Sequence, residues 1–187
     1  MPGPFYFHHL TLYLAPTMRY FEIFHERIAM QISVTGDSKC RLKTKTATIE
    51  LDGQLKINDL VLDGPGEYEK AGVFAEVTPD LAHLHIETLV IAVAGQKKRQ
   101  VTETELARLE DVDLLFVHAD NESADELQTI AKLIGEIEPR IVILVGVQKG
   151  ETFARIGGQT PETVENIKMT KSDLPEGERK IYLLKHT

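Results

Sequence analysis

The sequence predicts a mixed α/β domain of the α+β kind, and three observations support this fold class. Residues 30–94 hold short apolar runs separated by tight-turn signals, which is typical of β-sheet. Residues 101–147 hold two helix-capping signals and a strand–helix–strand succession. The chain has 187 residues, 42% of them hydrophobic and 27% charged, which is the balance of an ordinary globular domain with a substantial core.

The β-rich part starts at Met30. The run MQISVTG alternates and stops at Gly36, as a strand does. The run TATIELDGQLKI predicts two strands around Asp52-Gly53, because Asp-Gly favours a hairpin turn. Further strands are predicted in LVLDGPG, GVFAEV and ETLVIAVAGQKK, the last reaching a turn at Gly95.

In the second part, residues 101–147, the spacing of apolar residues changes. Thr102 and Glu105 predict a capping box that opens a short helix, and Ser123 and Glu126 predict another. The second helix is predicted to end before Pro139, and its apolar residues recur every three or four positions: Ala124, Leu127, Ile130, Ala131, Ile134 and Ile137.

Strands flank this helix from Val112 to Val147, so we expect a right-handed βαβ unit with parallel strands. Thr160-Pro161 predicts the start of a short helix, since proline is favoured at the first helical position. The final run, IKMTKSDLPEGERKIYLLK, predicts two strands around a Pro-Gly turn.

Charge and composition limit the class of partner. The formal net charge is -8, which argues against nonspecific nucleic-acid binding because phosphate neutralisation needs a basic face. No apolar run is long enough to predict a membrane span. Cys40 is the single cysteine, so an internal disulfide is impossible and a cytoplasmic location is expected.

Residues 1–29 differ from the predicted domain of residues 30–187, because they hold seven of the twelve aromatic side chains. They lack the basic start and cleavage site of a signal peptide. Two interpretations stay open. The segment docks on the domain or on a partner through its aromatic side chains, or it is upstream sequence that precedes a natural start at Met30.

Few residues suggest catalysis. No Gly-x-Ser-x-Gly elbow is present, and Ser38 has no neighbouring histidine in the sequence, so we expect it to be structural. The strongest metal candidates are His83, His85, His118 and Asp120. His83 and His85 would share one face of a strand, and His118 and Asp120 follow a predicted strand end. Their spacing matches no chelating motif, so exposed loop histidines are the competing interpretation.

The run DGPGEYEKAGVF combines Gly64, Pro65, Gly66, Glu67 and Tyr68. The glycines supply backbone freedom around a proline of fixed φ, so the sequence predicts a structural turn. We expect the tyrosine ring to pack and its hydroxyl to bond locally. The alternative is that Glu67 and Glu69, which share a face, act as an acid–base pair.

Five runs in this order resemble the metallo-β-lactamase-like fold, in its bacterial branch of small β-lactamase superfamily proteins related to UlaG-type hydrolases. They are MQISVTGDSKCRLKTKTATIELDG, DGPGEYEKAGVF, LEDVDLLFVHADN, IEPRIVILVGV and KSDLPEGERKIYLLK. The resemblance covers most of residues 30–185. It implies a two-sheet β-sandwich with outer helices, an αββα arrangement reduced in size.

The metal motifs of that family do not carry over. The usual Gly-His-Ser turn is Gly36-Asp37-Ser38 here, and the His-x-His-x-Asp-His loop is absent. Gly95 and lysines stand at the His-x-Gly-Asp turn, and Leu144-Val145-Gly146 at the Pro-Met-His turn.

The resemblance with these losses implies a metal-free pseudoenzyme without a cofactor, in a binding or assembly role. Its expected partner is a second copy of the chain or another protein. The alternative is a hydrolase of a small ester, phosphoester or lactone that holds zinc through His83, His85, His118 and Asp120. A small-ligand pocket at the vacated site is a third possibility.

Overall fold

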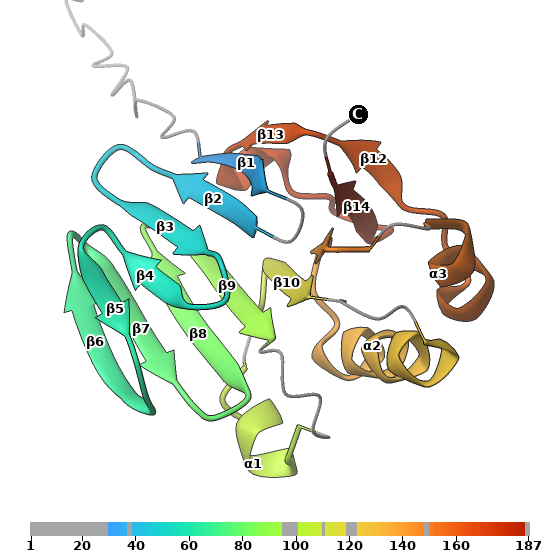
Figure 1. Cartoon of the computed structure of the whole chain (residues 1–187), viewed down its shortest axis with the longest axis horizontal. Helices are drawn as coiled ribbons and strands as arrows, with labels where there is room; N and C mark the ends of the chain where they lie inside the picture. The colour runs from blue at the N-terminus through green and yellow to red at the C-terminus, as the bar shows by residue number, and fades with distance from the viewer. Residues whose placement is uncertain are drawn as a thin grey trace, which may run out of the picture.

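The computed structural model of the chain describes residues 30–36, 39–94, 101–109, 111–118, 123–147 and 150–185. Residues 1–29, and with them the predicted N-terminal extension, lie outside this range. Two β-sheets stack face to face, and the α-helices pack on the larger sheet, on its side away from the smaller one (Figure 1). The predicted two-sheet sandwich is therefore present.

The smaller sheet has six strands in the order β13-β1-β2-β3-β4-β5. All of its pairings are antiparallel. Its strands are β1 (Met30–Gly36), β2 (Lys39–Lys43), β3 (Thr48–Leu51), β4 (Leu55–Ile57), β5 (Leu60–Leu62) and β13 (Asn166–Met169).

The larger sheet has eight strands in the order β12-β14-β11-β10-β9-β8-β7-β6. The strands from β12 to β9 run parallel, and those from β9 to β6 run antiparallel. Its strands are β6 (Gly66–Lys70), β7 (Val73–Val77), β8 (Leu81–Ile86), β9 (Leu89–Ala94), β10 (Leu114–His118), β11 (Ile141–Val145), β12 (Glu162–Val164) and β14 (Lys180–Leu184).

The helices are α1 (Glu103–Leu106), α2 (Ala124–Ile137), α3 (Gly150–Gly157) and the short 3₁₀ helix η1 (Lys171–Asp173). The predicted capping box at Thr102 is confirmed. The Thr102 side chain accepts the backbone N–H of Glu105, and the Glu105 side chain accepts the backbone N–H of Thr102. Ser123 caps α2 by accepting the N–H of Glu126 at 3.2 Å. None of the helices in the described part of the chain has the length and apolar character needed to cross a membrane.

Two apolar cores follow from the alternation of the strands. Between the sheets, side chains of the smaller sheet such as Ile32 and Ile49 pack with Leu84 and Phe116 of the larger sheet. On the other face of the larger sheet, a second core includes Leu127 and Ile130 of α2, with Leu115 and Val142 beneath them. The strands β10 and β11 contribute to both cores, which explains why their sequences are apolar at successive positions.

The Gly-Pro-Gly run is the corner where the chain leaves one sheet for the other. β5 is the last strand of the smaller sheet, and β6 is the edge strand of the larger one. Gly66 begins β6 with φ 157. The Tyr68 hydroxyl donates a hydrogen bond of 2.8 Å to the Gly64 carbonyl, and its ring packs on the core between the sheets. This run therefore closes one side of the sandwich.

One local prediction at the C-terminal end is wrong. Thr160-Pro161 opens no helix, because residues Glu162–Val164 instead form β12, which pairs in parallel with Tyr182–Leu184 of β14. Long-range strand pairing here overrides the local signal. The last two predicted strands are present as β13 and β14, and they belong to different sheets.

Candidate functional site

A cavity of about 470 Å³ opens at one edge of the sandwich, between the two sheets. It lies at the carboxyl ends of β9, β10 and β11, which are parallel neighbours. The β3–β4 turn and the β7–β8 turn complete its wall. Carboxyl ends of parallel strands are where open α/β sheets place their ligands. We call this space the edge cavity.

The inner wall of the edge cavity is apolar. Val93, Phe116 and Val145 line it from three adjacent parallel strands of the larger sheet. Leu51 and Leu62 face them from the smaller sheet. All five side chains belong to, or pack against, the core between the sheets, so the cavity is an opening at the end of that core.

Polar groups also line the edge cavity. Asp63 follows β5 and is exposed, whereas Asp80 in the β7–β8 turn is only 8% exposed. His118, at the end of β10, is half-buried and also lines the cavity. We call Asp63 and Asp80 the acidic rim. The cavity thus combines an apolar interior with two carboxylates and one imidazole.

Hydrogen bonds fix the turn that carries Asp80. The backbone N–H of Thr78 donates to the Leu81 carbonyl at 2.7 Å, and the Thr78 hydroxyl donates to the same oxygen at 3.1 Å. The Leu81 N–H donates back to the Thr78 hydroxyl oxygen at 3.2 Å. Asp80 lies inside this closed turn, so its position at the cavity is set by the backbone.

His83 and His85 lie on the opposite face of the larger sheet from the edge cavity. Within β8, Ala82 lines the cavity and Leu84 and Ile86 pack in the core between the sheets, so the two histidines face the other way. Their rings are 4.6 Å apart, centroid to centroid. The structure therefore brings these two together and separates them from His118 by the thickness of the sheet. Asp120 lies outside the described residues.

An ion pair beside His83 connects two segments of the fold. Arg108, which follows α1, forms an ion pair with Glu76, the strand neighbour of His83. This pair ties the α1 segment to β7. Burial lowers the pKa of His83, the neighbouring His85 lowers it further, and Glu76 acts in the opposite direction. Protonation of His83 is therefore disfavoured in the folded protein.

The positions of His83, His85 and His118 do not fit the zinc site that was the alternative prediction. A catalytic zinc needs at least three donor atoms converging at about 2.0–2.2 Å from one point. Among the described residues, no group of three or more His, Cys, Asp or Glu side chains is placed to hold a metal ion.

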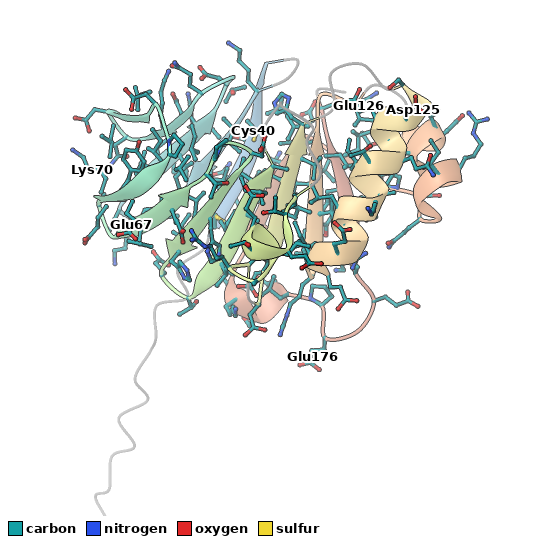
Figure 2. All side chains as sticks on the ribbon, turned by 90° about the horizontal axis from the view of Figure 1, so that it is seen from below. Cys40, Glu67, Lys70, Asp125, Glu126 and Glu176 are labelled. Atoms are coloured by element: carbon teal, nitrogen blue, oxygen red, sulfur yellow. The ribbon has the colours of Figure 1, made fainter. Side chains whose placement is uncertain are left out.

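The glutamates of the corner run lie at exposed positions of an edge strand. Glu67 and Glu69 alternate with Tyr68 along β6 and both are exposed. Figure 2 shows Glu67 and Lys70 at the outer side of the sandwich, far from its interior. Their strand partners are Glu76 and Phe74, so Glu67 lies opposite a third carboxyl group and Glu69 opposite an aromatic ring.

The sequence interpretation found one of the polar cavity residues and missed two. His118 was singled out because it ends a buried strand. Asp63 and Asp80 were missed because each lies in a turn, where aspartate is common for local reasons. The signal that could have found them is positional: Asp63 directly follows β5 and Asp80 directly precedes β8, and these two strand ends lie at the same edge of the sandwich.

Comparison with known proteins supports the fold. One similar solved structure is a protein from Thermotoga maritima described as a Zn-dependent hydrolase of the metallo-β-lactamase superfamily. It superposes with a TM-score of 0.65 and 15% identity, over 83% of this chain and 98% of that chain. Another is Igni18, a metallo hydrolase from the archaeon Ignicoccus hospitalis, with a TM-score of 0.55 and 8% identity, over 83% and 95%.

No family profile matches the sequence, and no curated protein matches it. At identities this low the two superpositions establish the fold alone. The chain has the metallo-β-lactamase-like fold, as the sequence resemblance implied.

Proposed function

We propose that this chain is a binding protein that holds a small, mainly apolar ligand in the edge cavity. The observation that carries the proposal is the cavity itself. Its volume of about 470 Å³ lies within the roughly 300–1,000 Å³ of small-molecule sites, and such sites are mostly apolar with a few convergent polar groups. Phe116, Val93 and Val145 supply the apolar wall, and the acidic rim and His118 supply the polar groups.

The position of the cavity also supports binding. Its wall comes from rigid strands of both sheets and from a turn closed by Thr78, so the site is largely formed before a ligand arrives. A preformed site loses less conformational entropy on binding than a flexible one. The separation of His83 and His85 from His118 favours this role over metal-dependent hydrolysis.

A neutral fluorescent probe of apolar sites, Nile red, tests the proposal. We expect saturable binding of one probe per chain, and we expect Val93→Phe to weaken it at least tenfold by filling the cavity. Phe74→Ser is the matched control, because Phe74 is 40% exposed on the other face of the larger sheet. If Phe74→Ser weakens probe binding and Val93→Phe does not, the proposal is contradicted. A second blocking variant, Val77→Phe, covers the case in which Val93→Phe does not fold.

Metal analysis of the purified protein tests the competing hydrolase. Protein made without added metal should carry less than one equivalent of zinc, iron or manganese in total. A bound metal would stabilise the folded state and raise the thermal unfolding midpoint. Because we expect no metal site, addition of zinc should leave this midpoint unchanged. One tightly held equivalent, lost together with thermal stability in His118→Ala, would establish a metal site and overturn the proposed role.

A further inference from the structure

The outer face of the smaller sheet carries a group of basic side chains. The helices α1, α2 and α3 pack on the far side of the larger sheet, so none of these three lies on this face (Figure 1). Alternation along β2 turns Leu42 into the core and its neighbours Arg41 and Lys43 outward. The basic side chains that face outward from this sheet in the same way are Lys39, Arg41, Lys43, Lys56 and Lys168. We call this surface the basic face.

Strand pairing places two of these lysines in one row. Gln31 of β1 pairs with Lys168 of β13 on one side and with Lys43 of β2 on the other. Neighbouring strands lie about 4.8 Å apart, so the two lysines flank one strand at a spacing of roughly 10 Å. Thr48 of β3 pairs with Lys43 and continues the row. None of these four described residues is acidic, so the row carries positive charge that no side chain within it neutralises.

The acids beside this row are matched to other cations. Arg41 donates to its strand neighbour Glu50, through Nε at 3.1 Å and through Nη2 at 2.9 Å. Lys56 lies 3.7 Å from Asp52, in the turn between β3 and β4. Each of these pairs is close to neutral. The excess positive charge of the basic face therefore comes from the lysines outside them.

The composition of the basic face indicates the class of partner. Lysine is depleted at the centre of protein–protein interfaces, so the face does not fit a stable protein contact. Nucleic-acid recognition relies on arginine forks and on stacked aromatic rings. The face offers mainly lysines, and its Arg41 is already held by Glu50. An anionic lipid surface attracts lysines as point charges, without a fixed hydrogen-bond geometry.

We propose that the basic face docks on an anionic lipid surface, with Lys43 and Lys168 at the headgroups. This role is separate from ligand binding in the edge cavity. The chain enters the same row at Met30, and residues 1–29 before it hold seven of the twelve aromatic side chains. Aromatic side chains favour the membrane–water interface, and stable attachment takes an apolar signal together with a basic one.

The negative net charge of the chain is compatible with this docking. Glu67 and Glu69 of β6 alternate with Tyr68, whose ring packs between the sheets, so they face outward from the larger sheet. Stacked sheets lie about 10 Å apart. That separation exceeds the screening length of about 8 Å at physiological salt, so acids on that side are largely screened from a surface at the basic face.

Sedimentation of the full chain with vesicles tests the proposal. The vesicles are phosphatidylcholine alone, or an equal mixture of phosphatidylcholine and phosphatidylglycerol. Binding to the mixed vesicles should be at least about tenfold tighter and should weaken as salt is raised. Lys43→Gln and Lys168→Gln should each weaken it about fivefold, which corresponds to about 1 kcal/mol for each basic group at the surface. Lys132→Gln is the control, since Lys132 is 58% exposed on α2, on the other side of the molecule.

Glu50→Gln gives a test in the opposite direction. It releases Arg41 from its partner, so binding to the mixed vesicles should become about fivefold tighter. The pair is exposed, so its loss should cost little stability, and thermal melting checks that each variant is folded.

Four results would overturn the proposal. Equal binding to both kinds of vesicle would assign attachment to an apolar contact, such as one made by residues 1–29. A loss in Lys132→Gln as large as that in Lys43→Gln would show that the position of the charge is irrelevant. Tighter binding of duplex DNA than of mixed vesicles, measured by fluorescence anisotropy, would replace the lipid by a nucleic acid. Absence of vesicle binding even at low salt would leave the basic face without this partner.

Discussion

The buried carboxylate of Asp113 allows a test of how this sandwich is held together. Its side chain is 2% exposed and lies at the amino end of β10. Lys171 of η1 donates to its two oxygens at 2.8 and 2.6 Å. The Val90 N–H donates to it at 2.9 Å, and Arg140 Nε is 4.0 Å away. The carboxylate therefore joins β9, β10 and the segment before β14.

Removal of the amine in Lys171→Ala should lower the free energy of unfolding by about 2 kcal/mol. The value lies between about 0–1 kcal/mol for an exposed ion pair and about 3–5 kcal/mol for breaking a fully buried one. It is intermediate because Asp113 is buried, whereas Lys171 is 45% exposed and water can partly replace it. For a chain of this size the loss corresponds to a thermal midpoint lower by about 4–8 °C.

Lys70→Ala is the matched control. Lys70 is 42% exposed, close to Lys171, and its nitrogen is 3.0 Å from Asp59, but that carboxylate is 81% exposed. The two lysine variants thus differ mainly in the burial of the acid they leave behind. Urea denaturation followed by circular dichroism should show a clear loss for Lys171→Ala and no measurable change for Lys70→Ala. Equal losses would refute the argument from burial.

Three further predictions follow from single residues. Burial raises the pKa of the Cys40 thiol to about 12, so iodoacetamide at pH 8 should label the unfolded chain and leave the native one unmodified; rapid native labelling would contradict the structure. Ala71 and Gly72 form a two-residue hairpin turn with φ values of 53 and 78, so Ala71→Asn should raise the free energy of unfolding by roughly 1 kcal/mol, measured in urea. The pKa of His83 is lower in the folded chain than its ordinary value of 6.5. Below pH 6.5 the unfolded chain therefore binds the proton more readily than the folded one. Stability from this group is then present above pH 6.5 and lost as the pH falls below it, and His83→Gln should flatten that part of the stability–pH curve; an unchanged curve would remove His83 as the cause.

Short-range patterns predicted much of the fold correctly. The Asp52-Gly53 hairpin, the cap at Thr102 and the helix ending before Pro139 are all present, because each depends on a few neighbouring residues. The strand β12 was mistaken for a helix because its pairing partner, β14, lies about twenty residues further along the chain. Helix α3 was missed because it has only 8 residues and a single buried side chain, Phe153.

The edge cavity shows what periodicity cannot reveal about a site. Val93, Phe116 and Val145 are unremarkable members of three apolar strands, and only their shared register places them together. Val93 pairs with Phe116, and Val145 pairs with His118, because β9, β10 and β11 are parallel neighbours. That neighbourhood depends on the strand order of the whole sheet, in which β14 lies beside β11 and β12 lies at the edge. A different strand order would keep every local pattern in the sequence and remove the cavity, so the binding proposal depends on this order and not on any one motif.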